Sequence, residues 1–367
     1  MKVLVTGSEG FVGKNLCALL RTQSDVTVYG YDKDSEPDAL PKLTADCDFV
    51  FHLAGVNRPD DTSQFAQNFS ITSYLTDCLR QNGNRAPIVF ASSIQAQCDN
   101  PYGQSKREAE RLLLEYGQQC GTKVLVYRLS NVFGKWCRPQ YNSVVATFCD
   151  AAANGRVLPI NDPDATVRLV YIDDVVAEFL RVLQAHDEMT SDIYAVQPIT
   201  SVTVGWLACR IAGFAAERTT LCTPDVADPL IKKLYSTYLT YLPAEQLCYP
   251  LTARADDRGA FYEFMRLKND GQISVNRIAP NASKGGHYHH TKAEKFLTVS
   301  GAGEVRLTPL HGGEPIVLPV DGQQCTVVDI PPGYVHWIVN TGDTELVTII
   351  WVNEWFCSEH TDTFLPG

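Results

Sequence analysis

The sequence predicts two fold classes in one chain, a doubly wound parallel α/β sheet followed by an all-β domain. The first half alternates apolar strand-like runs with amphipathic helical patterns, which is typical of a parallel sheet covered on both faces. After about residue 245 the segments become short, β-rich and separated by turn residues, as in sandwiches and barrels. A length of 367 residues also suits two domains. We therefore expect one domain over residues 1–245 and a second over residues 246–367.

Individual elements follow from the period of the apolar residues. In the first domain we expect strands at 2–7, 26–32, 48–55, 87–93 and 123–130, and helices over 11–23 and 105–119. In the second domain the expected strands are 261–267, 272–280, 294–301, 303–310, 314–320, 325–332, 335–342 and 345–353.

The composition excludes some classes of function. The formal net charge is −11 and there is no Lys/Arg tract, so a surface that follows nucleic-acid phosphates is not expected. The N-terminus has no signal-peptide architecture, and no apolar stretch is long enough to cross a bilayer. The 12 cysteines never form CxxC, as expected in a reducing compartment. We expect a soluble cytoplasmic protein without nucleic-acid or membrane partners.

A glycine-rich loop follows the first predicted strand. Gly7, Gly10 and Gly13 form GxxGxxG where a helix should begin. Residues without side chains let backbone N–H groups approach a pyrophosphate at the helix N-terminus, as in Rossmann-like dinucleotide-binding domains. Asp32 ends the second strand, where a carboxylate would accept hydrogen bonds from ribose hydroxyls. Lys33 could instead balance a 2′-phosphate, so these residues leave NAD and NADP both open.

A second group of residues indicates acid–base chemistry. Ser93 follows a predicted strand, and Tyr102 and Lys106 form YxxxK, so on a helix their side chains share one face. A free phenol has a pKa near 10 and exchanges protons poorly at neutral pH. We expect the nearby ammonium to lower the pKa of Tyr102, and Ser93 to hold a carbonyl or hydroxyl against it.

Several ordered motifs over residues 1 to about 245 resemble the extended short-chain dehydrogenase/reductase family, whose members typically act on nucleotide-linked sugars. They are TGSEGFVG (6–13), HLAG (52–55), Asn68, SSIQA (92–96), YGQSK (102–106), RLSNVFG (128–134) and RLVYIDDVV (168–176). The resemblance implies that Leu53, Ala54 and Gly55 line the cofactor. It further implies that Asn68, Ser93, Asn131 and Arg168 serve the substrate, Asn68 through the catalytic hydrogen-bond network.

Histidines cluster in the second domain. Within GGHYHHTKAE, His287 and His289 point to the same face of a strand and His290 to the other. Glu294 can fold back toward them, and PPGYVHWIVN adds His336. Imidazole nitrogens and a carboxylate form a suitable shell for zinc or a similar divalent ion. The sequence predicts a metal site of His287, His289, Glu294 and His336.

The same motifs resemble the cupin family, and this resemblance makes the expected C-terminal fold a cupin barrel. Asn281 and Cys325 depart from the pattern, because glycine is usual at both positions. The segments DDRGAFYEF (256–264), QISVN (272–276) and KGGHYHH (284–290) also resemble the nucleotide-sugar 3,5-epimerases. In that comparison His287 falls on the catalytic base. His287 therefore has two candidate roles, and the complete spacing to His289 and Glu294 favours that of ligand.

The combination resembles the bifunctional capsular polysaccharide enzymes of CapF type over essentially the whole chain, including FGKWC, YSTYL and WVNE. This resemblance implies NADPH (with NADH possible given Asp32), zinc or another divalent metal, and a UDP-4-keto-2,6-dideoxy-2-acetamido sugar. Because cupin barrels commonly pair through exposed strands, we expect a homodimer. Two alternatives are a single-function reductase with a structural or dimerising barrel, and an NADP-sensing module without catalysis. Such sensors generally lack the Tyr/Lys pair that this chain has.

Overall fold

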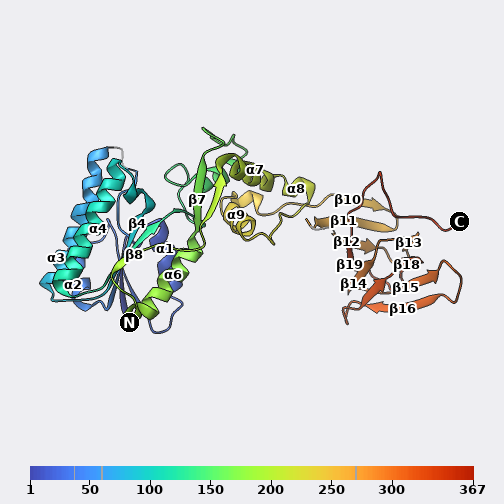
Figure 1. The fold of residues 1–367 in the computed structure, drawn as a ribbon. Coiled ribbons are helices and arrows are strands. Elements are labelled where there is room, and N and C mark those ends of the chain that lie inside the picture. Colours follow the sequence, from blue (N-terminus) through green and yellow to red (C-terminus); the bar gives the residue numbers. More distant parts are fainter. Residues whose placement is uncertain (37, 59–60, 269–270) are drawn as a thin grey trace. The chain divides into compact units, whose positions relative to one another are not determined.

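The structure, a computed structural model, describes residues 1–36, 38–58, 61–268 and 271–367. The chain forms two compact units (Figure 1). The first comprises Met1–Ala212 and Lys233–Leu242, and the second comprises Gly213–Lys232 and Pro243–Gly367. Each unit is described by itself.

The first unit is built on a parallel six-stranded sheet with the order β2-β1-β3-β4-β5-β8. Its strands are β1 Lys2–Thr6, β2 Thr27–Tyr31, β3 Phe49–His52, β4 Ile88–Ser93, β5 Val124–Leu129 and β8 Asp192–Tyr194. The order reverses on either side of β1 and β3, which is the doubly wound arrangement. The predicted Rossmann-like fold class is confirmed.

Helices cover both faces of this sheet (Figure 1). On one face, Val3 and Val5 of β1 pack with Leu16 of α1 and Phe179 of α6. On the other face, Leu4 of the same strand belongs to a cluster with residues of α2, α3 and α4. Alternation along one strand therefore supplies two cores. The helices are α1 Phe11–Leu20, α2 Ala39–Asp46, α3 Ala66–Gln81, α4 Pro101–Cys120 and α6 Ile172–Ala185.

A smaller sheet, which the sequence did not predict, has the order β6-β7-β9. Its strands are β6 Asn131–Phe133, β7 Thr166–Tyr171 and β9 Thr200–Thr203. The remaining helices are α5 Val144–Ala153, α7 Val204–Ala215, α8 Glu217–Thr220 and α9 Pro229–Leu239, with 3-10 turns at Thr62–Phe65, Ile94–Gln97, His186–Glu188 and Ala244–Gln246. No helix within the described ranges is both long and apolar enough to span a membrane.

The second unit is β-rich and consists of two antiparallel sheets, which confirms the predicted all-β, cupin-like class. One sheet has the order β10-β11-β12-β19-β14-β17 and the other β13-β18-β15-β16. Their strands are β10 Ala253–Asp256, β11 Gly259–Arg266, β12 Gln272–Ile278, β13 Ser283–His287, β14 Glu294–Ser300, β15 Ala302–Pro309, β16 Ile316–Asp321, β17 Val327–Ile330, β18 Tyr334–Asn340 and β19 Leu346–Val352.

Side chains from both sheets share one apolar core. Ile278, Phe296 and Ile350 belong to the first sheet, and Val305 and Ile338 to the second. Strand β12 alternates buried and less buried residues along its length, as expected of a sheet with one face against the core. The interior of this double-sheet body is where the predicted metal ligands lie.

The two positions where the sequence departs from the cupin pattern keep the backbone conformation that glycine would provide. Asn281 has φ of 61° and Cys325 has φ of 49°. Both lie in the left-handed region, which asparagine tolerates better than most residues. The turns therefore survive the replacement of glycine.

Candidate active sites in the two units

The glycine loop is the first element of the site in the N-terminal unit. Gly7 has φ of 73°, and its N–H donates to the Tyr31 carbonyl oxygen at 2.8 Å. A Cβ on Gly13 would lie 2.0 Å from the Gly7 oxygen, so the start of α1 can approach β1 only without a side chain there. Gly10 is the N-cap residue of α1. The three predicted glycines thus bring a helix N-terminus to the carboxyl end of β1, where a pyrophosphate binds in such folds.

The carboxylate after β2 is tied to this loop. Asp32 accepts hydrogen bonds from the backbone N–H groups of Glu9 and Lys33, both at 2.8 Å. The side chain of Lys33 is 83% exposed, with its Nζ 3.6 Å from Asp34. Asp32 therefore shapes the glycine loop, while Lys33 projects into solvent.

The segment after β3 crosses the same edge of the sheet. The Leu53 N–H donates to the Thr6 carbonyl oxygen at 3.0 Å. A Cβ on Gly7 would collide with the backbone of Ala54, and one on Gly55 would come within 3.1 Å of the Lys106 Nζ. Leu53, Ala54 and Gly55 thus lie between the glycine loop and the predicted catalytic lysine.

Ser93, Tyr102 and Lys106 converge in the structure. Ser93 ends β4. Helix α4 begins at Pro101, a residue that suits the first turn. The Asn100 side chain caps this helix by accepting a hydrogen bond from the Gly103 N–H at 2.8 Å. The side chain of Tyr102 lies close enough to that of Ser93 for Ser93 to lower its pKa. Lys106 lies one turn later, is 5% exposed, and its Nζ donates to the Ala91 carbonyl oxygen at 3.1 Å.

The electrostatics of this group differ from the sequence expectation. Burial raises the pKa of Tyr102 to about 12, and Ser93 offsets only part of this effect. The lysine does not lower it, since its ammonium points to the Ala91 oxygen and the Phe90 ring. Burial also lowers the pKa of Lys106 to about 8, against the opposing effect of Glu110. Tyr102 is therefore a neutral phenol at pH 7, the form that can donate a proton.

Besides Ser93, three more residues were expected to serve the substrate, and their surroundings differ. Asn68 is buried and uses both ends of its amide within the protein, toward Val56 and Ser105 at 2.7 to 3.0 Å. Asn131 and Arg168 are exposed on neighbouring strands of the small sheet, and the Asn131 side chain donates to the Arg168 carbonyl oxygen at 3.1 Å. Asn68 holds the loop after β3, whereas the guanidinium of Arg168 is open to solvent.

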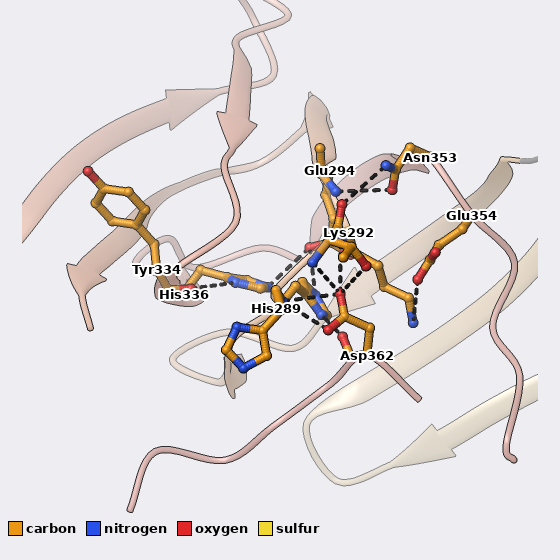
Figure 2. A network of polar contacts seen from close by, with 11 residues as sticks. His289, Lys292, Glu294, Tyr334, His336, Asn353, Glu354 and Asp362 are labelled. Atoms are coloured by element: carbon orange, nitrogen blue, oxygen red, sulfur yellow. Dashed lines mark hydrogen bonds and ion pairs between the residues drawn. The ribbon is translucent and has the colours of Figure 1, made fainter. Parts of the chain in front are cut away.

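In the C-terminal unit the predicted metal ligands come together, and Figure 2 shows three of them, His289, Glu294 and His336. His287 ends β13 and is directly opposite His336 of β18, while His289 lies just beyond the end of β13. Glu294 begins β14 in the other sheet. The ligand atoms of the three histidines lie within 4.8 Å of one another. The Oε2 atom of Glu294 is 3.1 Å from Nε2 of His336 and 3.7 Å from Nε2 of His289.

These residues fit a divalent cation. Both the Nε2 atom of His289 and the Oε2 atom of Glu294 are buried without a hydrogen-bond partner, although buried polar atoms are nearly always satisfied. Burial and the neighbouring His336 lower the pKa of His287 to about 4. Burial alone would raise the pKa of Glu294, but the adjacent His289 and His336 lower it to about 2. Neutral imidazole and ionised carboxylate are the forms that bind metals.

The cluster faces a cavity of about 290 Å³. Apolar side chains such as Phe261 and Ile350 line it together with three cations, Arg254, Lys284 and Lys292. Lys292 is only 4% exposed and lies 3.7 Å from Glu354. Sequence reasoning missed these cations. Lys292 lies between the predicted ligands His289 and Glu294 in the sequence, and this position could have identified it as a residue of the site. Arg254 and Glu354 are distant in sequence from these ligands, so no pattern indicated that they lie near the site.

Two family models match separate parts of the chain. Residues 3–196 match the NAD dependent epimerase/dehydratase family and residues 254–364 match the polysaccharide biosynthesis C-terminal domain. The chain is 40% identical to the UDP-2-acetamido-2,6-beta-L-arabino-hexul-4-ose reductase of Pseudomonas aeruginosa, over 99% of this chain and 98% of the relative.

Solved structures give the same picture. The capsular polysaccharide assembling protein CapF of Staphylococcus aureus superposes with a TM-score of 0.92 at 40% identity, covering 100% of this chain and 99% of that one. The UDP-glucuronic acid 4-epimerase of Bacillus cereus in complex with NAD has a TM-score of 0.57 at 18% identity, covers 66% of this chain and 96% of that one, and shares the fold alone. The chain belongs to the CapF-type family of capsular polysaccharide assembling proteins, in which an epimerase/dehydratase domain precedes a polysaccharide biosynthesis C-terminal domain.

Proposed function

We propose that this chain is a bifunctional nucleotide-sugar enzyme that uses the ketone of one UDP-4-keto sugar twice. The C-terminal unit epimerises C3, and the N-terminal unit then reduces C4 with NADPH as the hydride donor. The observation that carries the proposal is the presence in one chain of two complete sets of groups. These are Ser93, Tyr102 and Lys106 in one unit and His287, His289, Glu294 and His336 in the other.

The substrate class comes from the relatives. The P. aeruginosa protein is named for the reduction of a UDP-2-acetamido-2,6-hexul-4-ose, and we assign the corresponding UDP-2-acetamido-2,6-dideoxy-4-hexulose to this chain. Inversion at C3 and reduction at C4 would give UDP-2-acetamido-2,6-dideoxy-L-talose, on the route to UDP-N-acetyl-L-fucosamine for a capsular or surface polysaccharide. We place the reaction in the cytoplasm and retain the expectation of a homodimer.

In the N-terminal unit the chain's own groups bind, orient and protonate. Gly7, Gly10, Gly13, Asp32, Lys33 and residues 53–55 would hold the dinucleotide, which supplies a hydride to the C4 carbon. Ser93 would hold the ketone oxygen against Tyr102. Because Tyr102 keeps its proton at pH 7, it can pass that proton to the oxygen as C4 is reduced. Lys33 is the side chain we assign to the 2′-phosphate of NADPH.

In the same unit, Asn131 and Arg168 are assigned to the nucleotide-sugar phosphates, because both are exposed beside one another. Asn68 is assigned to positioning, since its amide is already satisfied by Val56 and Ser105. Its removal would release the loop that packs against Lys106.

In the C-terminal unit His287, His289, Glu294 and His336 would hold a divalent cation, for which we propose zinc. A cation bound there supplies positive charge beside a ketone oxygen, and so acidifies the neighbouring C–H. The surrounding chain provides a partly apolar cavity with further positive charge from Lys292 and Arg254. Such an environment favours the charge that develops on a sugar oxygen when the C3 proton passes to a base. His287 is the candidate for that base if it is not a ligand.

The order of the two steps follows from carbonyl chemistry. The C3 proton is acidic only while C4 is a ketone, so epimerisation must precede reduction. The alternative of a reductase with a structural barrel predicts no exchange of the C3 proton. The alternative of a sensing module predicts no turnover of the reductant.

Product analysis tests the proposal. Purified protein is incubated with a panel of UDP-4-keto sugars and either NADPH or NADH, and the products are identified by NMR. We expect the 2-acetamido-2,6-dideoxy substrate to give a product inverted at C3 and reduced at C4, faster with NADPH. A product reduced at C4 with C3 unchanged would refute the epimerase assignment, and no reduction with either cofactor would refute the reductase assignment.

A further inference from the structure

A segment near residue 362 is bound to the loop that carries the metal-ligand candidate His289 (Figure 2). The two stretches are more than 70 residues apart in sequence, yet the backbones of Tyr288 and Phe364 exchange hydrogen bonds at 2.9 and 3.0 Å. The rings of these two residues stack with centroids 5.5 Å apart. The contact is therefore a short antiparallel bridge fixed by both backbone and side chains.

The carboxylate of Asp362 satisfies the loop backbone directly after His289. It accepts hydrogen bonds from the N–H groups of His290 at 2.9 Å, Thr291 at 2.7 Å and Lys292 at 2.8 Å. The Thr291 hydroxyl donates to the same group at 2.8 Å. Three successive N–H groups around one carboxylate form a charge-assisted anchor, which fixes the path of the loop.

The main-chain oxygen of Asp362 contacts His289 itself. The Nδ1 atom of His289 is hydrogen-bonded to this oxygen. A carbonyl oxygen can only accept, so Nδ1 carries the proton and the lone pair of the neutral ring is on Nε2. That Nε2 atom is the buried, unpartnered one beside Glu294. One residue thus sets both the orientation and the tautomer of the imidazole.

The other histidines are held differently. His287 and His336 lie within paired strands, and the Nδ1 atom of His336 lies 3.4 Å from the oxygen of Tyr334 on its own strand. His289 follows the end of β13 and has no such ladder. Its carbonyl oxygen accepts a hydrogen bond from the Gly333 N–H at 2.8 Å, but its ring is held by the segment that carries Asp362.

We infer that Asp362 is a positioning residue for a divalent cation at this site, acting through the backbone of the His289 loop and through the His289 Nδ1 atom. This inference rests on the proposed metal site and adds to it a residue outside the ligand set. Outer partners of this kind typically change metal affinity by about 10- to 100-fold.

The test measures metal binding without substrate or reductant. The metal-free protein is titrated with Co²⁺, and the dissociation constant and visible spectrum are recorded for the unaltered chain, Asp362→Ala, Asp362→Asn and His289→Ala. Asp321→Ala is the matched control, because Asp321 also caps a turn in this unit, through the Gln323 N–H at 2.8 Å, but does not line the cavity.

We expect Asp362→Ala to weaken Co²⁺ binding by about 10- to 100-fold and to shift the spectrum toward that of His289→Ala. Asp362→Asn keeps one acceptor oxygen and should lose less, while Asp321→Ala should bind as the unaltered chain does. Thermal unfolding of the C-terminal unit in the same samples reports on folding. If Asp362→Ala does not fold, the Co²⁺ affinity of Asp362→Asn decides.

Unchanged Co²⁺ affinity and spectrum in the Asp362 variants would overturn this inference and leave the proposed function intact. Failure of the unaltered chain to bind Co²⁺ would overturn both the proposed metal site and the role of Asp362.

Discussion

The Oε2 atom of Glu294 lies 3.1 Å from the Nε2 atom of His336, although the two residues belong to different sheets. Glu294 is at the first position of β14 and His336 is the third residue of β18. Their proximity therefore comes from the packing of the two sheets and not from local sequence. The arrangement places a carboxylate among three imidazoles in the lining of one cavity.

Substitution of His287 separates its two candidate roles. We expect His287→Asn to weaken divalent-cation affinity by at least about 100-fold, since a direct ligand should matter more than an outer partner, and to abolish proton exchange at C3. Metal content and exchange are measured on the same preparation. Full metal content combined with lost exchange would identify His287 as the base instead of a ligand.

Removal of the phenol hydroxyl should affect only reduction. Tyr102→Phe is expected to lower the rate of C4 reduction by about 10²- to 10⁴-fold, the usual contribution of a positioned acid, and to leave exchange at C3 unchanged. The reciprocal variant His336→Ala should lose exchange but still reduce a ketone that is already epimerised. Undiminished NADPH turnover by Tyr102→Phe would contradict the assigned proton donor.

The rate of reduction should depend on pH through Lys106. Burial lowers its pKa from 10.5 to about 8, so the ammonium is present below pH 8 and is lost as the pH rises through that value. Tyr102, with a pKa of about 12, stays protonated throughout. We expect the single-turnover rate to fall above pH 8, and Lys106→Met to be slow with no such fall. A constant rate up to pH 10 would argue against a role for the charge.

Two glycine substitutions test the cofactor loop. A Cβ on Gly13 would meet the Gly7 oxygen at 2.0 Å, whereas a Cβ on Gly213 of α7 meets nothing within 4 Å. Gly13→Ala should therefore weaken NADPH binding at least tenfold, about 1.4 kcal/mol. Gly213→Ala should leave binding unchanged and raise stability by up to about 1 kcal/mol. Equal affinities of the two variants would show that the close approach is not needed.

The sequence predicted those parts of the fold that depend on local patterns. Five of the six described strands of the parallel sheet and eight of the ten described strands of the second unit were expected from apolar periodicity, which reflects burial on one or two faces. Strands β8 and β10, of three and four residues, were not expected. Strand β13 was missed because its sequence, Ser283–His287, contains two glycines and few apolar residues. The small β6-β7-β9 sheet was missed because its partners are distant in the chain.

The sites show the same division. Motif spacing was sufficient to predict Tyr102, Lys106 and the three histidines as site residues. Tyr102 and Lys106 lie on one helix, and the histidines lie on or next to two paired strands. The prediction that the pKa of Tyr102 is lowered was wrong. Burial, which raises this pKa, depends on tertiary packing, and the ammonium of Lys106 is directed to the Ala91 oxygen. Asp362 could not have been found from sequence, as its contacts span more than 70 residues.

Proton exchange without reductant tests the central claim most directly. The protein, loaded with zinc, is incubated in D₂O with the UDP-4-keto-2-acetamido-2,6-dideoxy sugar and no NADPH, and C3 is examined by NMR. We predict deuterium at C3 in the unaltered chain and in Tyr102→Phe, and none in His336→Ala. Absence of deuterium from the substrate incubated with the unaltered, metal-loaded chain would contradict the account.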